Sequence, residues 1–256
     1  MSSRDGLLLV GHGSARYPDA SSAMLRHAEA LRIGGRFSRI EVAVLNGTPS
    51  VGSALARLDA PAIRPDIRVV PFFMEDGWFV RVAVPEALRA ATGGRRLSRQ
   101  IMLCPPIGVH DGMAGIIERQ ALAYCATHFI ASHTAAIVII GHGSATAPGQ
   151  TLALHRHAAR VAATTLFARV EPACLEEAPF VADALRGLRT HPVIAIGFFA
   201  NQGAHVRDDL PALIAAEQNA RGAAGRPVHT LGPITEDPAV ADIILDQAMS
   251  EPLTFL

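Results

Sequence analysis

The chain has 256 residues, half of them apolar, and its 23 acidic and 23 basic side chains give a formal net charge of zero. That length can bury one large core or two small ones, and the balanced charge argues against a nucleic-acid-binding protein, which normally has a basic excess. Every basic residue is an arginine. The absence of lysine excludes a Schiff-base lysine, a lysine general base and the lysine of a P-loop.

The cysteines and the apolar segments indicate where the protein works. Cys104, Cys125 and Cys174 are far apart and form no C-x-x-C pair, which is typical of a reducing compartment. The apolar run at residues 7–10 is too short for a signal peptide, and polar residues interrupt the uncharged stretch 120–155 throughout. We therefore expect a soluble, cytoplasmic protein without a membrane span.

Short apolar runs alternate with longer amphipathic stretches along the whole chain. This alternation predicts an α/β fold in which helices cover both faces of a parallel sheet. Ligands of such sheets bind at the carboxyl ends of the strands. The expected strands are residues 7–10, 40–45, 67–73, 100–104, 135–140, 170–175, 192–199 and 227–231. The expected helices of the second half are residues 150–167, 180–188, 206–220 and 238–249, and the first half has matching helices.

The second half of the sequence repeats the first. Residues 7–28 align with residues 137–158, which places one Gly-His-Gly-Ser motif over another at a shift of 130. Further along, residues 72–85 align with residues 198–211 at a shift of 126. The repeat predicts two tandemly duplicated lobes, 1–130 and 131–256, with a cleft between them.

Each Gly-His-Gly-Ser motif directly follows the first strand of its repeat. Its histidine is His12 in the first half and His142 in the second. Flanking glycines let the backbone turn sharply and leave the imidazole uncovered. A tight glycine turn alone is the alternative, but such a turn has no need of histidine, and two copies favour a functional role.

Two further candidates follow the second and third strands of the second half. Glu176 follows the second strand and His205 the third, so both can lie near His142 at one edge of the sheet. Two imidazoles and a carboxylate with open positions suit an exchangeable divalent cation. The first half has Asn46 and Phe79 at the matching places, so we expect a single metal site, in the C-terminal lobe. The alternatives are a solvated loop acid and an exposed residue at a helix start.

These motifs together resemble a known family. A strand ending in Gly-His-Gly-Ser, a strand followed by Leu-Glu before Pro, and Gly-x-His-x-x-x-Asp-x-Pro after a third strand are similar to the class II, ATP-independent sirohydrochlorin chelatases of the CbiX/SirB type. The tandem layout is like the family's long form, whereas short members resemble one half and pair as homodimers. The resemblance implies two α/β lobes around a cleft, with the metal handled at positions that match His142, Glu176 and His205. In better-known long members the N-terminal lobe usually carries the site, and here that lobe departs from the pattern.

The resemblance implies insertion of Co²⁺, or next Fe²⁺ or Ni²⁺, into sirohydrochlorin in cobalamin or other tetrapyrrole biosynthesis, with no organic cofactor. His142 and His205 would bind the metal or accept pyrrole protons, with Glu176 assisting. The macrocycle carries carboxylates that suit guanidinium groups, although surface charge is the alternative for each arginine. The expected substrate-binding residues are Ser144, Asn201, Gln202, Gly203, Arg207, His12, Arg16 and Arg81.

Two other functions stay open. One is a non-catalytic carrier of metal or tetrapyrrole with the same fold. The other is a phosphohistidine phosphatase or mutase, which needs an arginine directly before the histidine, where this chain has Gly11 and Gly141. The expected partners are a tetrapyrrole and a divalent metal, not nucleic acid or membrane, and the chain is expected to be a monomer or a homodimer.

Overall fold

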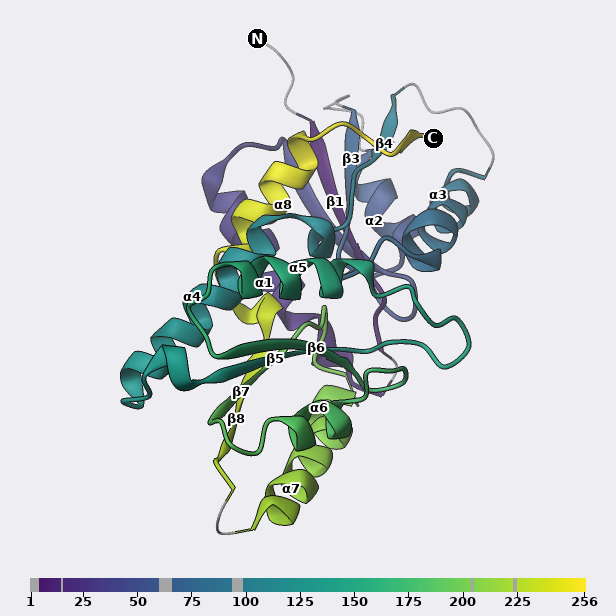
Figure 1. Ribbon diagram of the computed structural model, residues 1–256. Coiled ribbons are helices and arrows are strands. Elements are labelled where there is room, and N and C mark those ends of the chain that lie inside the picture. Colours follow the sequence, from purple (N-terminus) through teal and green to yellow (C-terminus); the bar gives the residue numbers. More distant parts are fainter. Residues whose placement is uncertain (1–4, 15, 60–65, 94–98, 204, 223–224) are drawn as a thin grey trace. The chain divides into compact units, whose positions relative to one another are not determined.

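The computed structural model describes the whole chain except residues 1–4, 15, 60–65, 94–98, 204 and 223–224 (Figure 1). The chain divides into two compact units. Unit 1 is Met1–His110 with Pro238–Leu256, and unit 2 is Asp111–Asp237. Within the described part of the chain, no helix is both long enough and apolar enough to cross a bilayer.

Unit 1 contains a five-stranded sheet in the order β2-β1-β3-β4-β9. The first four strands are parallel, and the C-terminal β9, which the sequence pattern did not predict, pairs antiparallel with β4. The strands are β1 (Gly6–Gly11), β2 (Arg39–Val44), β3 (Ile67–Pro71), β4 (Ile101–Leu103) and β9 (Thr254–Phe255). The helices are η1 (Pro18–Ser21), α1 (Ser22–Gly34), α2 (Val51–Leu58), η2 (Phe79–Ala83), α3 (Val84–Thr92), η3 (Ile107–Val109) and α8 (Val240–Met249).

Unit 2 contains a four-stranded parallel sheet in the order β6-β5-β7-β8. The strands are β5 (Ala136–Gly141), β6 (Arg169–Cys174), β7 (Val193–Gly197) and β8 (Val228–Pro233). The helices are α4 (Gly112–Thr127), η4 (Ser132–Thr134), α5 (Leu152–Ala163), α6 (Val181–Gly187), η5 (His205–Asp209), α7 (Leu210–Arg221) and η6 (Ile234–Glu236).

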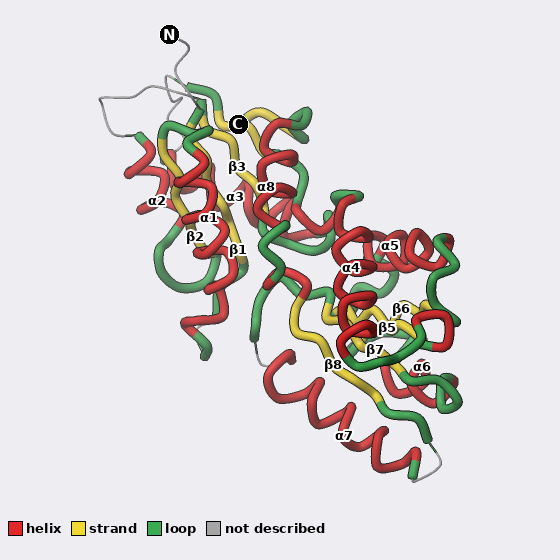
Figure 2. Tube along the Cα trace, turned by 90° about the vertical axis from the view of Figure 1, so that its left-hand side faces the viewer, coloured by secondary structure: helices red, strands yellow, loops and turns green. Residues whose placement is uncertain are grey.

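Helices cover both faces of each sheet, which confirms the predicted α/β class. In unit 1, α2 and α3 bury one face, and α1 packs with α8 over the other (Figure 1). In unit 2, α6 and α7 bury one face and α4 packs with α5 over the other (Figure 2). Strands β1 and β5 are buried along their whole length, which is why both read as unbroken apolar runs.

The strand order fixes where a ligand can bind. In each sheet the first strand of the repeat lies between the second and the third, so the chain crosses to opposite sides of that strand. The carboxyl end of such a central strand is a topological switch point, where open α/β sheets bind their ligands. Both Gly-His-Gly-Ser motifs lie at this point.

The last helix of each sequence repeat packs in the other compact unit. Helix α4 ends the first repeat but packs against α5 in unit 2, and its counterpart α8 ends the second repeat but packs against α1 in unit 1. The compact units therefore do not coincide with the sequence halves 1–130 and 131–256. Those halves, and the cleft expected between them, stay predictions.

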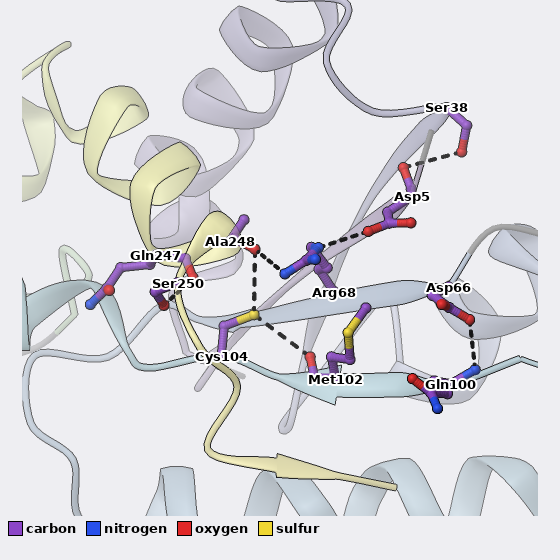
Figure 3. A network of polar contacts seen from close by, with 10 residues as sticks. All are labelled: Asp5, Ser38, Asp66, Arg68, Gln100, Met102, Cys104, Gln247, Ala248 and Ser250. Atoms are coloured by element: carbon purple, nitrogen blue, oxygen red, sulfur yellow. Dashed lines mark hydrogen bonds and ion pairs between the residues drawn. The ribbon is translucent and has the colours of Figure 1, made fainter. Parts of the chain in front are cut away.

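A polar network joins α8 to the sheet of unit 1 (Figure 3). On β3, Nε of Arg68 donates to the carboxylate of Asp5, and NH1 of Arg68 donates to the carbonyl oxygen of Ala248, each at 2.7 Å. Cys104 lies in the same network, and burial raises the pKa of its thiol to about 11. The arginine binds both the strand end and α8, which accounts for the position of the C-terminal helix in unit 1.

Candidate metal centre

His142 lies in the loop directly after β5, and backbone hydrogen bonds tie that loop to the one after β6. The carbonyl oxygen of His142 accepts from the N–H groups of Leu175 at 3.1 Å and Glu176 at 3.0 Å. These bonds place the Glu176 carboxylate beside the imidazole, with Oε2 3.7 Å from Nδ1 of His142. The expected pairing of these two side chains at one edge of the sheet is therefore present in the structure.

The imidazole of His142 has a defined orientation. Its Nδ1 atom lies 3.0 Å from the carbonyl oxygen of Gly143. A carbonyl only accepts hydrogen bonds, so this contact favours the tautomer with the proton on Nδ1 and the lone pair on Nε2. The side chains of His142 and Glu176 are 46% and 39% exposed, so both can contact a ligand that arrives from solvent.

The glycines of the motif are needed for two different close approaches. Gly143 has φ +73°, and a Cβ there would lie 2.7 Å from Cγ of Glu177. Its counterpart Gly13 has φ +78°, and a Cβ there would lie 2.1 Å from the carbonyl oxygen of Asn46. The preceding Gly141 lies against α5, where a Cβ would lie 3.0 Å from Leu154. A tight turn explains the glycines, but it leaves the two histidines unexplained.

Glu177 is a positioning residue that the sequence analysis did not identify. Its side chain is buried, with 6% exposed. Oε2 accepts from the backbone N–H of Gly149 at 2.7 Å, and Oε1 accepts from the hydroxyl of Thr151 at 3.0 Å. It thus ties the loop after His142 to the end of β6. In the sequence, Glu176 and Glu177 are adjacent carboxylates after an apolar strand. That pattern marks both as candidates, but it does not show which of the two is buried.

The backbone of His205 begins η5, as expected for a residue at a helix start, but its side chain lies outside what the structure describes. The backbone hydrogen bonds next to His205 repeat those next to Phe79. The carbonyl oxygen of Gly203 accepts from the N–H groups of the residues three and four positions on, at 3.1 Å each. Gly77 does the same in unit 1, at 3.1 and 3.0 Å. The loops that carry His205 and Phe79 therefore share one backbone hydrogen-bond pattern.

In unit 1, the corresponding positions hold His12, Asn46 and Phe79. The N–H of Asn46 donates to the carbonyl oxygen of His12 at 2.9 Å, as Glu176 does to His142 in unit 2. The rings of His12 and Phe79 lie edge to face, with centroids 4.8 Å apart. Neither an amide nor a phenyl ring supplies a strong metal ligand. Among the side chains that the structure describes, no three of His, Cys, Asp or Glu form a metal-binding group. The side chain of His205 is not among them.

The expected substrate-binding residues of unit 2 are mostly fixed within the loops of this edge. The hydroxyl oxygen of Ser144 accepts from the N–H of Ala147 at 3.1 Å. The amide nitrogen of Gln202 donates to Glu236 at 2.8 Å. Asn201 lies beside them, and its side-chain oxygen is buried without a hydrogen-bond partner among the described residues. Gly203 lies before η5, and Arg207 lies within it and is half-buried.

In unit 1, the two expected arginines follow β1 and β3: Arg16 lies in the loop after β1, and Arg81 lies in η2, after β3. Arg81 is 61% exposed and forms an ion pair with Asp76. Arg16 is exposed, and its guanidinium lies 5.1 Å from the ring centroid of Tyr17.

A second polar cluster lies away from this edge, in unit 2. The hydroxyl of Tyr124 on α4 lies 3.0 Å from Nδ1 of His229 on β8. The ring of Tyr124 also stacks on His128, with centroids 3.8 Å apart. Burial, and secondarily the charge of His128, lowers the pKa of His229. Sequence reasoning assigned His229 no partner, because its contact residue lies more than a hundred positions away.

The chain was compared with known proteins. The CbiX family profile matches residues 6–123 and again residues 136–251. A probable sirohydrochlorin cobaltochelatase of Halobacterium salinarum is 23% identical over 94% of this chain and 90% of its own length.

Solved structures share the fold. A multi-domain Deinococcus radiodurans protein with structural similarity to chelatases aligns at TM-score 0.80 and 23% identity over 97% of this chain, which spans 55% of that protein's length. SirB from Bacillus subtilis with Fe³⁺ aligns at TM-score 0.79 and 18% identity, over 95% of this chain and 94% of its own. SirB from the subspecies spizizenii in complex with cobalt aligns at TM-score 0.75 and 18% identity, over 96% of this chain and 94% of its own.

The two matched segments together span most of the chain, and they coincide with the internal repeat and its two Gly-His-Gly-Ser motifs. The chain therefore belongs to the CbiX/SirB family of class II, ATP-independent sirohydrochlorin chelatases, in its tandem form.

Proposed function

We propose that this chain inserts a divalent cation into sirohydrochlorin at a single metal centre in unit 2. His142 and His205 are the metal ligands, and Glu176 assists as a ligand or a proton acceptor. The observation that carries this proposal is the 3.7 Å approach of His142 and Glu176, two side chains from different loops. The unit 1 counterparts add a second, independent argument for His205.

His205 is the repeat counterpart of Phe79. The two share a backbone hydrogen-bond pattern at Gly77 and Gly203, and the ring of Phe79 lies 4.8 Å from that of His12. Two imidazoles bound to one cation through nitrogens about 2.1 Å from it have ring centroids roughly 5 Å apart. Two histidines at the spacing of His12 and Phe79 can therefore share one cation, and the repeat counterparts of these residues are His142 and His205.

The chemistry requires a site that binds the cation and then releases it. Metallation breaks the bonds from the cation to the protein, forms bonds to the four macrocycle nitrogens, and releases two pyrrole N–H protons. Few protein ligands and exposed, open positions suit such a transfer. A neutral imidazole or a carboxylate near the macrocycle can accept the protons. No step needs a nucleotide, which agrees with the family's independence of ATP.

The identity of the metal follows only in part from the site. Nitrogen and oxygen donors bind Fe²⁺, Co²⁺ and Ni²⁺ in rising order, so geometry and supply select the ion. We propose Co²⁺ as the first substrate, supported by the name of the Halobacterium salinarum relative, and Fe²⁺ as the second. We place the reaction in the cytoplasm, because the three cysteines are free thiols in the structure. One chain would suffice for activity, since the duplication supplies two units, and a homodimer is the alternative.

A non-catalytic carrier is the second candidate, favoured by the loss of the metal-ligating residue types in unit 1. The two functions differ in metallation rate. The test is anaerobic absorbance of sirohydrochlorin with Co²⁺ or Fe²⁺, with wild type, His205→Ala and, for the unit 1 motif, His12→Ala. Metallation faster than the uncatalysed rate in wild type and in His12→Ala, but not in His205→Ala, is the expected result. Metal binding without any acceleration in wild type would favour the carrier.

A further inference from the structure

Three aromatic side chains gather at the carboxyl ends of β1 and β3 in unit 1. Phe73 and Phe79 are nearly parallel, with centroids 5.6 Å apart and an interplanar angle of 13°. Trp78 meets Phe79 edge-on at 5.3 Å. We call Phe73, Trp78 and Phe79 the aromatic platform. It occupies the place in unit 1 where unit 2 would bind its cation.

The platform is exposed although it is strongly apolar. Trp78 is 58% exposed and Phe79 is 39% exposed. Aromatic rings contribute most to stability when they are buried, so adjacent exposed rings usually mark a binding surface. The counterparts in the second repeat are Ala204 and His205. Unit 1 thus differs from unit 2 by the loss of a metal ligand and the gain of two neighbouring aromatic rings.

Buried neighbouring residues hold the aromatic platform in place. Phe73 is partly buried against the core of unit 1. Val80, the residue after Phe79, is fully buried and fixes the first turn of η2 in the apolar interior of unit 1. The platform is therefore presented on the fold as a fixed surface, which reduces the entropy lost when a flat ligand stacks on it.

We propose that the aromatic platform binds a face of the tetrapyrrole macrocycle. This inference rests on the proposed function for the identity of the ligand. Stacking on aromatic rings suits a flat conjugated ring, and the exposed guanidinium of Arg81 lies two residues from Phe79, where a peripheral carboxylate can reach it.

A second copy of the chain is the competing occupant. Stable protein interfaces bury roughly 800 Å² on each partner. Two exposed rings offer much less apolar surface than that. The platform is therefore better suited to a small flat ligand than to a protein partner.

The test separates binding of the macrocycle from binding of the metal. Trp78 is the single tryptophan of the chain, so the quenching of tryptophan emission follows the binding of metal-free sirohydrochlorin directly. We would compare wild type with Phe79→Leu, which keeps an apolar side chain but removes the ring, and with Phe79→Tyr, which keeps a ring. Phe255→Leu is the matched control, because Phe255 is 60% exposed on β9 of the same unit.

Phe79→Leu should raise both the Kd of metal-free sirohydrochlorin and the KM of metallation about three- to tenfold, with Co²⁺ affinity and kcat close to wild type. Phe79→Tyr and Phe255→Leu should keep wild-type values. Unchanged Kd and KM in Phe79→Leu would overturn the inference. So would loss of a dimer in that variant without any change in Kd, since the platform would then be a protein interface.

Failure of the proposed function gives a different result. A wild type that never metallates the macrocycle faster than background, yet binds it more tightly than Phe79→Leu does, would overturn the chelatase function while supporting the platform as a tetrapyrrole site.

Discussion

The ring of His12 lies 4.8 Å from the ring of Phe79, edge to face. In unit 1, His12 thus contacts Phe79. The repeat counterpart of Phe79 in unit 2 is His205. One half of the duplicated chain keeps the backbone of the proposed metal site and has an aromatic ring in it. This relationship leads to the first prediction.

The Asn46→Glu, Phe79→His double variant should create a second metal site in unit 1. The backbone of Asn46 already binds the carbonyl of His12 as Glu176 binds that of His142, so the new carboxylate and imidazole would lie near His12. Equilibrium dialysis with Co²⁺ should give about one additional equivalent per chain. The single variant Asn46→Glu is the control. Equal Co²⁺ stoichiometry in the double variant and wild type would contradict the structural equivalence of the two sites.

Glu176 and Glu177 are adjacent but should behave differently when replaced. Glu177→Gln removes a buried charged acceptor of two hydrogen bonds, so the free energy of unfolding should fall by about 1–3 kcal/mol. Glu176→Gln changes an exposed side chain, so stability should stay within about 0.5 kcal/mol of wild type, whereas Co²⁺ affinity should fall about 10- to 100-fold. Urea denaturation and Co²⁺ titration of both variants check this. The reverse assignment of the two effects would show that the buried carboxylate is the metal-handling one.

The stability of the protein should depend on the protonation of His229. Its pKa in the folded protein is lowered from 6.5 by burial, so the unfolded chain binds the proton more tightly. The contribution of neutral His229 is therefore fully present above about pH 6.5 and is lost as the pH falls toward the lowered value. Urea denaturation between about pH 7 and pH 5 should show a shallower loss of stability in His229→Gln. Identical pH profiles would contradict the prediction.

Helix α8 should depend on Gln247 more than α4 depends on its repeat counterpart Gln120. Gln247 is buried and donates to the carbonyl oxygen of Pro106 at 2.6 Å. Gln247→Ala leaves that carbonyl without its donor, so the free energy of unfolding should fall by about 1–3 kcal/mol. Gln120 is half-buried and donates to Asp237 at 3.1 Å, so Gln120→Ala should cost less. Denaturation of both variants measures the difference in the free energy of unfolding. Equal losses would argue against the Gln247–Pro106 hydrogen bond as an anchor of α8.

Much of the fold and the position of the site were predictable from the sequence. Apolar runs of β-branched residues marked the buried strands, and the repeated motifs placed His12 and His142 at the carboxyl ends of β1 and β5. The pairing of His142 with Glu176 followed from strand order, because the carboxyl ends of neighbouring parallel strands share one edge.

Other features depend on contacts that the pattern does not encode. Helices α4 and α8 are repeat counterparts with similar apolar faces, so each fits against the first helix of either repeat. The sequence alone therefore does not show that each packs against the first helix of the other repeat. The inward orientation of Glu177 depends on Gly149 and Thr151, which are more than twenty residues away along the chain. The aromatic platform was missed because stacking between Phe73 and Phe79 is a tertiary contact.

The most direct measurement is anaerobic Co²⁺ binding to wild type, His142→Ala and His12→Ala. A single metal centre in unit 2 predicts one tight equivalent of Co²⁺ in wild type, its loss in His142→Ala and its retention in His12→Ala. Two equivalents in wild type, or loss in His12→Ala with retention in His142→Ala, would contradict the account.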